Sequence, residues 1–279
     1  MNESDLLLAD GRSLHVYDTH PGDEGRLSVF WHHGTPNLGA PPVPLFEASD
    51  WLGIRWVSFD RPGYGGSTPA PGRTMASVAG DVAAVADALR IDRFAVVGYS
   101  GGGSYALGSA AALGDRVEAV VSLAGIAPYD ADGLDWFAGM IPSGVLALKA
   151  AIRGREAKTA HELSVIEYDA EFTAADLAMF EGPWGWLGSV AGPASDAGPY
   201  GHIDDDVSYV LPWGCDPTSI PAPVLLVHGG DDGIIPSSHG EWLASHLPTA
   251  ELRLEPTLGH ISVLSCAEGG LEWIREQTG

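Results

Sequence analysis

The chain of 279 residues is 45% hydrophobic, which is enough to bury a large core in one large domain or two small ones. Its formal net charge of −23, from 37 acidic and 14 basic side chains, repels phosphates and anionic lipid headgroups, so nucleic-acid and membrane partners are disfavoured. Two cysteines make no disulfide framework, the acidic start indicates no signal peptide, and no apolar run approaches the length of a membrane span, so we expect a cytoplasmic protein.

Strands and helices alternate through the first part of the chain. Two stretches, 6–9 and 13–17, flank Asp10-Gly11, a turn signal that predicts a hairpin. Buried strands are expected at 27–31, 54–59, 94–97 and 117–124, and a stripe of Val78, Val82, Val85 and Leu89 predicts a helix. This alternation favours an α/β fold, with a mostly parallel central sheet and helices on both of its faces.

The alternation stops at residue 129 and resumes after residue 215. Within this interval, helices are predicted at 134–151, at 158–168 and after Thr173, where Thr-Ala-Ala-Asp resembles a capping box. Beyond it, the pattern predicts a strand at 223–228, a helix at 241–247, a strand at 251–254 and a last helix. We therefore expect an α/β core of residues 1–128 and 216–279 and a helical cap, or lid, insertion of residues 129–215.

A glycine-rich turn follows the buried strand at 94–97. Its sequence Gly98-Tyr99-Ser100-Gly101-Gly102 fits G-x-S-x-G, a nucleophile elbow that holds its serine in a strained conformation between strand and helix. A dinucleotide-binding turn needs an acidic residue at the end of the next strand, and a P-loop needs Gly-Lys-Ser/Thr; neither is present. An ordinary glycine-rich turn remains the alternative on this motif alone.

A serine hydroxyl is a weak nucleophile and needs a base and a group that orients the base. In an open α/β sheet such groups gather at the carboxyl ends of the strands. Ser100, the pair Asp231-Asp232 and His260 each follow a predicted strand, in the order Ser…Asp…His. That order is typical of α/β-hydrolases and differs from the chymotrypsin-like and subtilisin-like orders.

Further segments support this interpretation: His33-Gly34-Thr35-Pro36, Asp60-Arg61-Pro62-Gly63-Tyr64-Gly65-Gly66-Ser67, Gly229-Gly230-Asp231-Asp232-Gly233-Ile234-Ile235-Pro236 and Gly259-His260. With the elbow, they make the chain resemble a serine hydrolase of the α/β-hydrolase-fold superfamily with a helical cap. The resemblance implies that Ser100 attacks a carbonyl, that His260 moves its proton and that Asp232, rather than Asp231, is the acid. It also implies an oxyanion hole formed by the backbone N–H groups of Thr35 and Gly101, and no cofactor.

The expected cap would cover the elbow with an apolar pocket. Candidate pocket residues are Tyr99, His33, Met140, Phe180, Trp184 and Trp186, with Ala138 and Leu146 as further possibilities. Packing of the cap onto the core is the alternative role for its aromatic residues. We expect His32 and His33 to hydrogen-bond to backbone near the oxyanion loop and His228 to be a packed polar residue.

No HExxH or CxxC pair is present, so no metal site is expected. Asp204-Asp205-Asp206 could attract a cation, but a solvated acidic loop is the preferred interpretation. The segment 60–63 is expected to form a tight turn that ties neighbouring loops together.

Serine stands where haloalkane dehalogenases and epoxide hydrolases carry aspartate, which favours acyl chemistry. We expect hydrolysis of a small, largely uncharged or apolar ester, lactone or related acyl substrate through an acyl-enzyme. Tyr99 and Gly101 match neither the tryptophan of proline iminopeptidases nor the methionine of haloperoxidase-like esterases and carbon–carbon bond hydrolases. The alternatives are an amide, peptide or carbon–carbon bond hydrolase, an acyltransferase, or a non-catalytic ligand receptor of the same fold, as a monomer or homodimer.

Overall fold

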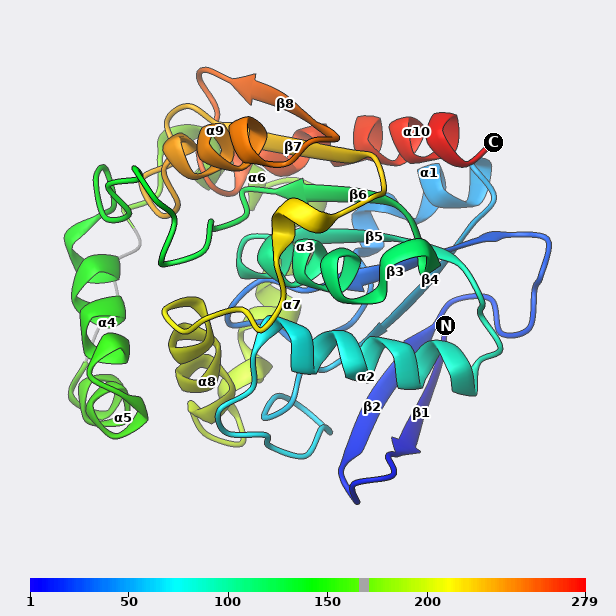
Figure 1. Cartoon of the computed structure of the whole chain (residues 1–279), viewed down its shortest axis with the longest axis horizontal. Helices are drawn as coiled ribbons and strands as arrows, with labels where there is room; N and C mark the ends of the chain where they lie inside the picture. The colour runs from blue at the N-terminus through cyan, green and yellow to red at the C-terminus, as the bar shows by residue number, and fades with distance from the viewer. Residues whose placement is uncertain (166–170) are drawn as a thin grey trace.

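A computed structural model describes residues 1–165 and 171–279, which form a sheet with helices on both faces (Figure 1). The eight strands of these residues lie in the order β1-β2-β4-β3-β5-β6-β7-β8. They are β1 Asn2–Leu7, β2 Ser13–Asp18, β3 Leu27–His32, β4 Ile54–Phe59, β5 Phe94–Tyr99, β6 Val117–Leu123, β7 Val224–Gly229 and β8 Ala250–Glu255. The pairs β1–β2 and β2–β4 are antiparallel and the other pairs are parallel, which confirms the predicted fold class.

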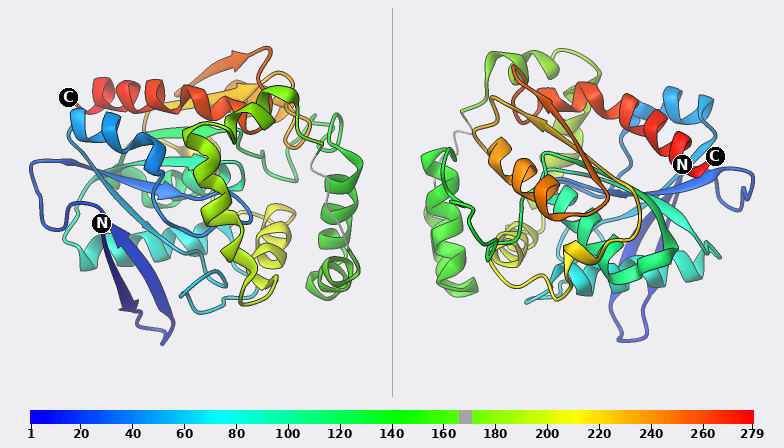
Figure 2. Two further views of the ribbon diagram at one scale, coloured as in Figure 1. Left: turned by 180° about the vertical axis from the view of Figure 1, so that it is seen from behind. Right: turned by 45° about the horizontal axis from the view of Figure 1, so that its top comes forward.

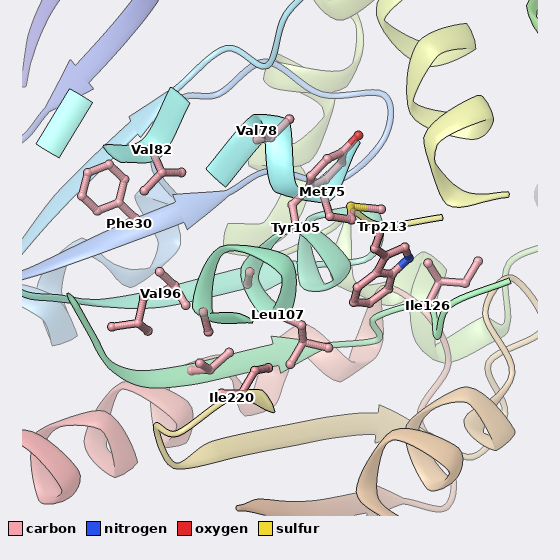
Figure 3. Packing of buried hydrophobic residues seen from close by; sticks show 14 of the residues in the cluster. Phe30, Met75, Val78, Val82, Val96, Tyr105, Leu107, Ile126, Trp213 and Ile220 are labelled. Carbon is pink, nitrogen blue, oxygen red and sulfur yellow. The ribbon is translucent and has the colours of Figure 1, made fainter. Parts of the chain in front are cut away.

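The two faces of the sheet have separate hydrophobic cores. Phe94 and Val96 of β5 pack with α2 (Met75–Ala88), α3 (Gly101–Leu113) and α9 (Ser237–His246), as Figure 3 shows in part. Ala95 and Val97 point to the opposite face, which α1 (Phe46–Trp51) and α10 (Ala267–Thr278) cover (Figure 2). Successive residues of a strand alternate between faces, so a strand buried on both sides reads as one continuous apolar run.

The N-terminal hairpin is present, but its first strand begins at Asn2 instead of residue 6. All six residues of β1 pair with β2, from Asn2 opposite Asp18 to Leu7 opposite Ser13. Most of β1 is exposed, because this strand lies at the edge of the sheet. Its position therefore depends on backbone pairing with β2, and its few apolar residues did not indicate where it starts.

Short helices replace strands between β6 and β7. In the described residues the α-helices here are α4 Pro142–Ile152, α5 Arg155–Ser164, α6 Ala174–Met179, α7 Leu187–Ala191 and α8 Tyr200–Tyr209. Helices α4 and α5 pack side by side and contact α8 at one end of the sheet (Figures 1 and 2). We call residues 129–215 the helical segment. Within the described chain no helix combines the length and the apolar character needed to cross a bilayer.

Two of the helices predicted in this segment have different bounds. The prediction of one helix over 134–151 is wrong at its start, because α4 begins at Pro142. Proline fits the first turn of a helix, where no backbone N–H is needed, but it breaks a helix that continues through it. The helix predicted at 158–168 is α5, which begins at Arg155 and ends at Ser164; residues 166–168 of that prediction lie outside the described residues. Thr173 caps α6 with Asp176 as predicted.

The prediction of a solvated acidic loop at residues 204–206 is wrong. Asp204, Asp205 and Asp206 lie within α8 and are 1%, 0% and 7% exposed. Arg73 and Arg155 pair with Asp204, while Lys158 pairs with Asp206 at 2.6 Å. Burial of three carboxylates is tolerated because each has a cationic partner.

His239 connects α9 to the start of the helical segment. Its Nδ1 accepts from the N–H of Ala127 at 3.2 Å, and its Nε2 donates to the carbonyl oxygen of Trp136 at 3.0 Å. Burial lowers the pKa of His239 to about 4, so the ring is neutral at pH 7. The pKa in the unfolded chain is about 6.5, so the stability that depends on the neutral ring is complete above pH 6.5 and is lost as the pH falls toward 4.

We therefore expect protonation linked to His239 to lower the free energy of unfolding by about 2 kcal/mol between pH 7 and pH 5. Urea unfolding of the wild type and His239→Gln at both pH values measures this. Between pH 7 and pH 5, the free energy of unfolding of the variant should fall by about 2 kcal/mol less than that of the wild type. Equal losses in the two proteins would contradict the assignment.

Candidate active site

Ser100 lies at the sharp turn between β5 and α3. Its φ is 58° and its ψ is −131°, a conformation that a side chain disfavours. A Cβ on Gly98 would lie 2.1 Å from the carbonyl oxygen of Gly102, and a Cβ on Gly102 would lie 2.1 Å from that of His32. The glycines are therefore required for the close approach of strand and helix, as the elbow motif predicts.

The structure brings Ser100, His260 and Asp232 into one line of hydrogen bonds. Ser100 Oγ lies 2.9 Å from His260 Nε2, and His260 Nδ1 lies 2.8 Å from Asp232 Oδ2. The other oxygen of Asp232 accepts the N–H groups of Ile234 and Ile235, each at 2.9 Å. All three side chains are buried, whereas Asp231 is exposed. Such a line lets an imidazole take the hydroxyl proton while the carboxylate orients the ring.

A carboxylate of the helical segment holds the loop that carries His260. Asp176 Oδ1 accepts the N–H groups of Ile261 and Ser262, at 2.8 and 2.7 Å, and the Ser262 hydroxyl at 2.8 Å. A Cβ on Gly259 would lie 2.3 Å from Asp176 Oδ2, so a side chain at this position would displace the Asp176 carboxylate. Burial opposes ionisation of Asp176, but hydrogen bonds from Ser262 and Thr173 keep its pKa below the ordinary value. The carboxylate is therefore charged and is a strong acceptor.

Arg61 holds the loop that carries Thr35. Its guanidinium donates to the carbonyl oxygens of His33 and Gly34, and its backbone N–H donates to His33 Nε2 at 3.1 Å. The Nδ1 of His33 donates to the carbonyl oxygen of Gly34 at 2.8 Å. Segment 60–63 thus ties neighbouring loops together as predicted, and the Arg61 side chain makes most of the hydrogen bonds that do so.

Asp205 of α8 holds Arg61 in turn. Its Oδ1 accepts from Arg61, Arg73 and Tyr105, and its Oδ2 accepts from Arg61, Tyr64 and Thr35. Burial opposes ionisation, but the positive charges of Arg61 and Arg73 hold the pKa of this carboxyl well below its usual range. The loop that carries Thr35 is therefore fixed to α8 by a charged and fully hydrogen-bonded group.

Most of the predicted pocket residues belong to the hydrophobic cores of different sheet faces. Tyr99 and Trp184 are buried in the core on the α10 face, with Phe180 and Trp186 packed against it, whereas Met140 belongs to the core on the α2 face. The Tyr99 hydroxyl donates to the carbonyl oxygen of His260 at 3.2 Å. His33 is occupied by its loop bonds, and Leu146 is exposed.

The other histidines form local contacts. His33 bonds to backbone as predicted, but His32 does not: its Nε2 lies 3.1 Å from the hydroxyl of Ser109. His228 is buried, with its Nε2 2.7 Å from the carbonyl oxygen of Ile235, which agrees with a packed polar residue.

One group of acidic and imidazole side chains in the described residues has the spacing of metal ligands. Glu162, His202 and Asp206 place one ligand atom each within 4.8 Å of one another, within the described part of the chain. The ammonium group of Lys158 already binds both carboxylates of this group. The positive charge that a cation would supply is therefore present in the protein.

Sequence reasoning did not find the roles of Asp176 and Asp205. The capping box marks Asp176 as a helix-start residue, but no signal connects it with residues 259–262. The aspartate run marks Asp205 as acidic, but its partners Arg61 and Arg73 lie more than 130 residues away in the chain.

A mostly parallel α/β sheet, a strained serine at a strand–helix turn, and a buried histidine–aspartate pair beside it define a hydrolase of the α/β type. A family model described as alpha/beta hydrolase fold matches residues 28–265, and the chain belongs to this family.

Curated relatives of the chain are hydrolases of different kinds. It is 28% identical over 216 residues to a pimeloyl-[acyl-carrier protein] methyl ester esterase of Nitrosomonas europaea, covering 77% of this chain and 81% of that one. It is 27% identical over 268 residues to a 2-hydroxy-6-oxononadienedioate/2-hydroxy-6-oxononatrienedioate hydrolase of Burkholderia vietnamiensis, covering 91% and 87%. The enol-lactonase from Burkholderia xenovorans LB400 shares the fold, with a TM-score of 0.71 at 19% identity over 99% of both chains. The family and these relatives identify the chain as a hydrolase.

We expect Asp205→Asn to lower the free energy of unfolding by about 3–5 kcal/mol, because it leaves the buried Arg61 without its counter-ion and removes the closer of the two carboxylates that pair with Arg73. Urea unfolding at pH 7 measures the loss. Asp196→Asn, which removes an exposed carboxylate from the same segment, should change stability by less than about 0.5 kcal/mol. Equal effects of the two substitutions would contradict the role of Asp205.

We expect Asp176→Ala to lower kcat for an ester about tenfold, because the loop that carries His260 loses its anchor. Asp176→Asn, which keeps one carbonyl oxygen as an acceptor, should retain more of the activity than the alanine variant. A purely structural role would lower the unfolding midpoint of both variants but leave the kcat of the folded protein unchanged. Measuring kcat on variants that circular dichroism shows to be folded, together with their unfolding midpoints, separates these outcomes.

Proposed function

We propose that Ser100, His260 and Asp232 form a catalytic triad that hydrolyses a small, largely uncharged or apolar ester or lactone through an acyl-enzyme. The observation that carries the proposal is the line of hydrogen bonds from Ser100 Oγ through the His260 ring to Asp232, at 2.9 and 2.8 Å. In this line Asp232 accepts from Nδ1–H, which leaves Nε2 free to accept the serine proton.

The reaction then proceeds in two halves. The Ser100 hydroxyl attacks the carbonyl carbon while His260 takes its proton, and the backbone N–H groups of Thr35 and Gly101 stabilise the negative oxygen. His260 returns the proton to the leaving group, which departs and leaves an ester on Ser100. Water, activated by His260 in the same way, releases the acid and restores the enzyme.

The charges around the oxyanion loop support an uncharged substrate. Arg61 and Arg73 are both buried, and both bind Asp205, at 2.7 and 2.6 Å. Neither arginine is therefore available to bind a carboxylate or phosphate of a substrate. In this proposal the helical segment, residues 129–215, is the cap that covers the site, because it contacts the loops that carry Thr35 and His260.

A carbon–carbon bond hydrolase is the second candidate. It is favoured by the relative from Burkholderia vietnamiensis, which is named for an oxo-dienedioate substrate and covers 91% of the chain. That substrate is a dianion, whereas the buried arginines here are already paired. We therefore rank the ester or lactone substrate first.

The test combines covalent labelling with turnover. A fluorophosphonate should add once to the wild type by intact mass and not at all to Ser100→Ala, and p-nitrophenyl esters of increasing chain length should be hydrolysed only by the wild type. A faster turnover of a 2-hydroxy-6-oxodienoate than of any ester would favour the carbon–carbon bond hydrolase. Transfer of the acyl group to an added alcohol in preference to water would indicate an acyltransferase.

Asp231 supplies a matched control. Asp232→Asn should lower kcat by about 10³–10⁴, because the His260 ring loses the carboxylate that orients it. Asp231→Asn changes an exposed neighbour and should stay within about twofold of the wild type. Equal activity of the two variants, or no adduct on the folded wild-type protein, would contradict the proposed triad.

A further inference from the structure

The hydroxyl of Tyr209 lies beside both residues of the proposed oxyanion hole. Tyr209 is the last residue of α8, and its hydroxyl is 2.6 Å from Thr35 Oγ1. A Cβ built on Gly101 would lie 1.8 Å from the same hydroxyl oxygen and 3.0 Å from Thr35 Oγ1. The phenol from the helical segment therefore occupies the space that a side chain at position 101 would fill. This accounts for glycine directly after the serine.

The hydrogen bonds at Thr35 determine where the Tyr209 proton points. Thr35 Oγ1 has one proton, and its neighbour Asp205 Oδ2, at 2.7 Å, is a carboxylate that can only accept. Arg61, at 3.0 Å, can only donate to Thr35 Oγ1. The Thr35 proton therefore goes to Asp205, and Tyr209 is the donor in its bond with Thr35.

The Tyr209 proton is the one in this group that can be redirected. If it turns away, Thr35 Oγ1 still accepts from Arg61 and still donates to Asp205, so the threonine keeps a donor and an acceptor. Burial, together with the charge of Asp205, holds the pKa of Tyr209 well above its usual value, so the phenol stays protonated at any working pH. Arg61 and Arg73 balance the charge of Asp205, so a negative oxygen nearby does not face an unpaired carboxylate.

We propose that the Tyr209 hydroxyl is a third donor of the oxyanion hole, turning from Thr35 Oγ1 to the substrate oxygen as negative charge develops there. This inference rests on the proposed function. The phenol keeps its proton throughout: no covalent bond forms or breaks at Tyr209, and one hydrogen bond replaces another. A preorganised donor aimed at a developing charge lowers the transition state more than the ground state.

The test is Tyr209→Phe, which keeps the ring that packs in the core and removes the hydroxyl. We expect kcat for p-nitrophenyl acetate to fall about 10–100-fold with KM within about twofold. Affinity for an alkyl trifluoromethyl ketone, which forms an oxyanion on the serine, should fall by a similar factor. Affinity for the matching methyl ketone should not change. Tyr17→Phe is the control: it removes the hydroxyl of a different buried tyrosine, on β2, which donates to Asp60, and it should leave kcat unchanged.

A double-mutant cycle separates two roles of the Tyr209 hydroxyl: donating a hydrogen bond to the substrate oxygen, and holding the Thr35 side chain in place. Thr35→Ala already removes the hydrogen bond between Tyr209 and Thr35 Oγ1. If Tyr209 donates to the substrate, adding Tyr209→Phe to this variant should still lower kcat at least about tenfold. If Tyr209→Phe has no effect in that background, or none in the wild type, the inference is overturned. A wild-type protein that neither hydrolyses p-nitrophenyl acetate nor reacts with a fluorophosphonate would overturn the proposed function itself. If the wild type is active and Tyr209→Phe is equally active, only the inference about Tyr209 fails and the proposed function stands.

Discussion

The ion pairs of Asp205 with Arg61 and Arg73 are the interaction on which the arrangement of the site depends. A carboxylate with no exposure to water is costly unless its oxygens are fully hydrogen-bonded, and Asp205 accepts three bonds on each oxygen. These bonds come from the loops after β3 and β4, from the residue before the N-cap of α2 and from α3. Because the geometry of every donor must be met at once, the carboxylate fixes these segments relative to one another.

The helical segment contributes to the site from two sides. Asp176 holds the loop that carries His260, and Asp205 holds the loop that carries Thr35, through contacts that span 85 and 170 residues of the chain. The α/β core supplies the serine turn and the loop with Asp232. The groups proposed to react are therefore positioned jointly, since neither the core nor the helical segment alone fixes all of the loops.

The relatives of the chain show why the fold does not decide the substrate. An ester hydrolase and an oxo-dienedioate hydrolase are similar to this chain at nearly the same identity, 28% and 27%. The backbone turn at the serine is common to the fold, and the difference lies in the groups around it. In this chain those groups include a glycine at 101 and a phenol from α8, and the buried arginines are already paired.

The sequence by itself determined the features that depend on neighbouring residues. The apolar runs, the glycines around Ser100 and the capping box at Thr173 act over a few residues, so pattern was enough to predict the parallel sheet, the turn and the start of α6. The same kind of local pattern gave wrong predictions for the start of the helix at Pro142 and for the exposure of Asp204-Asp205-Asp206. Only the tertiary structure decided that these carboxylates are buried, that Asp176 reaches the loop of His260 and that Tyr209 lies beside Gly101. A charge is stabilised in a protein interior by partners that folding brings close, and no spacing along the chain encodes those partners.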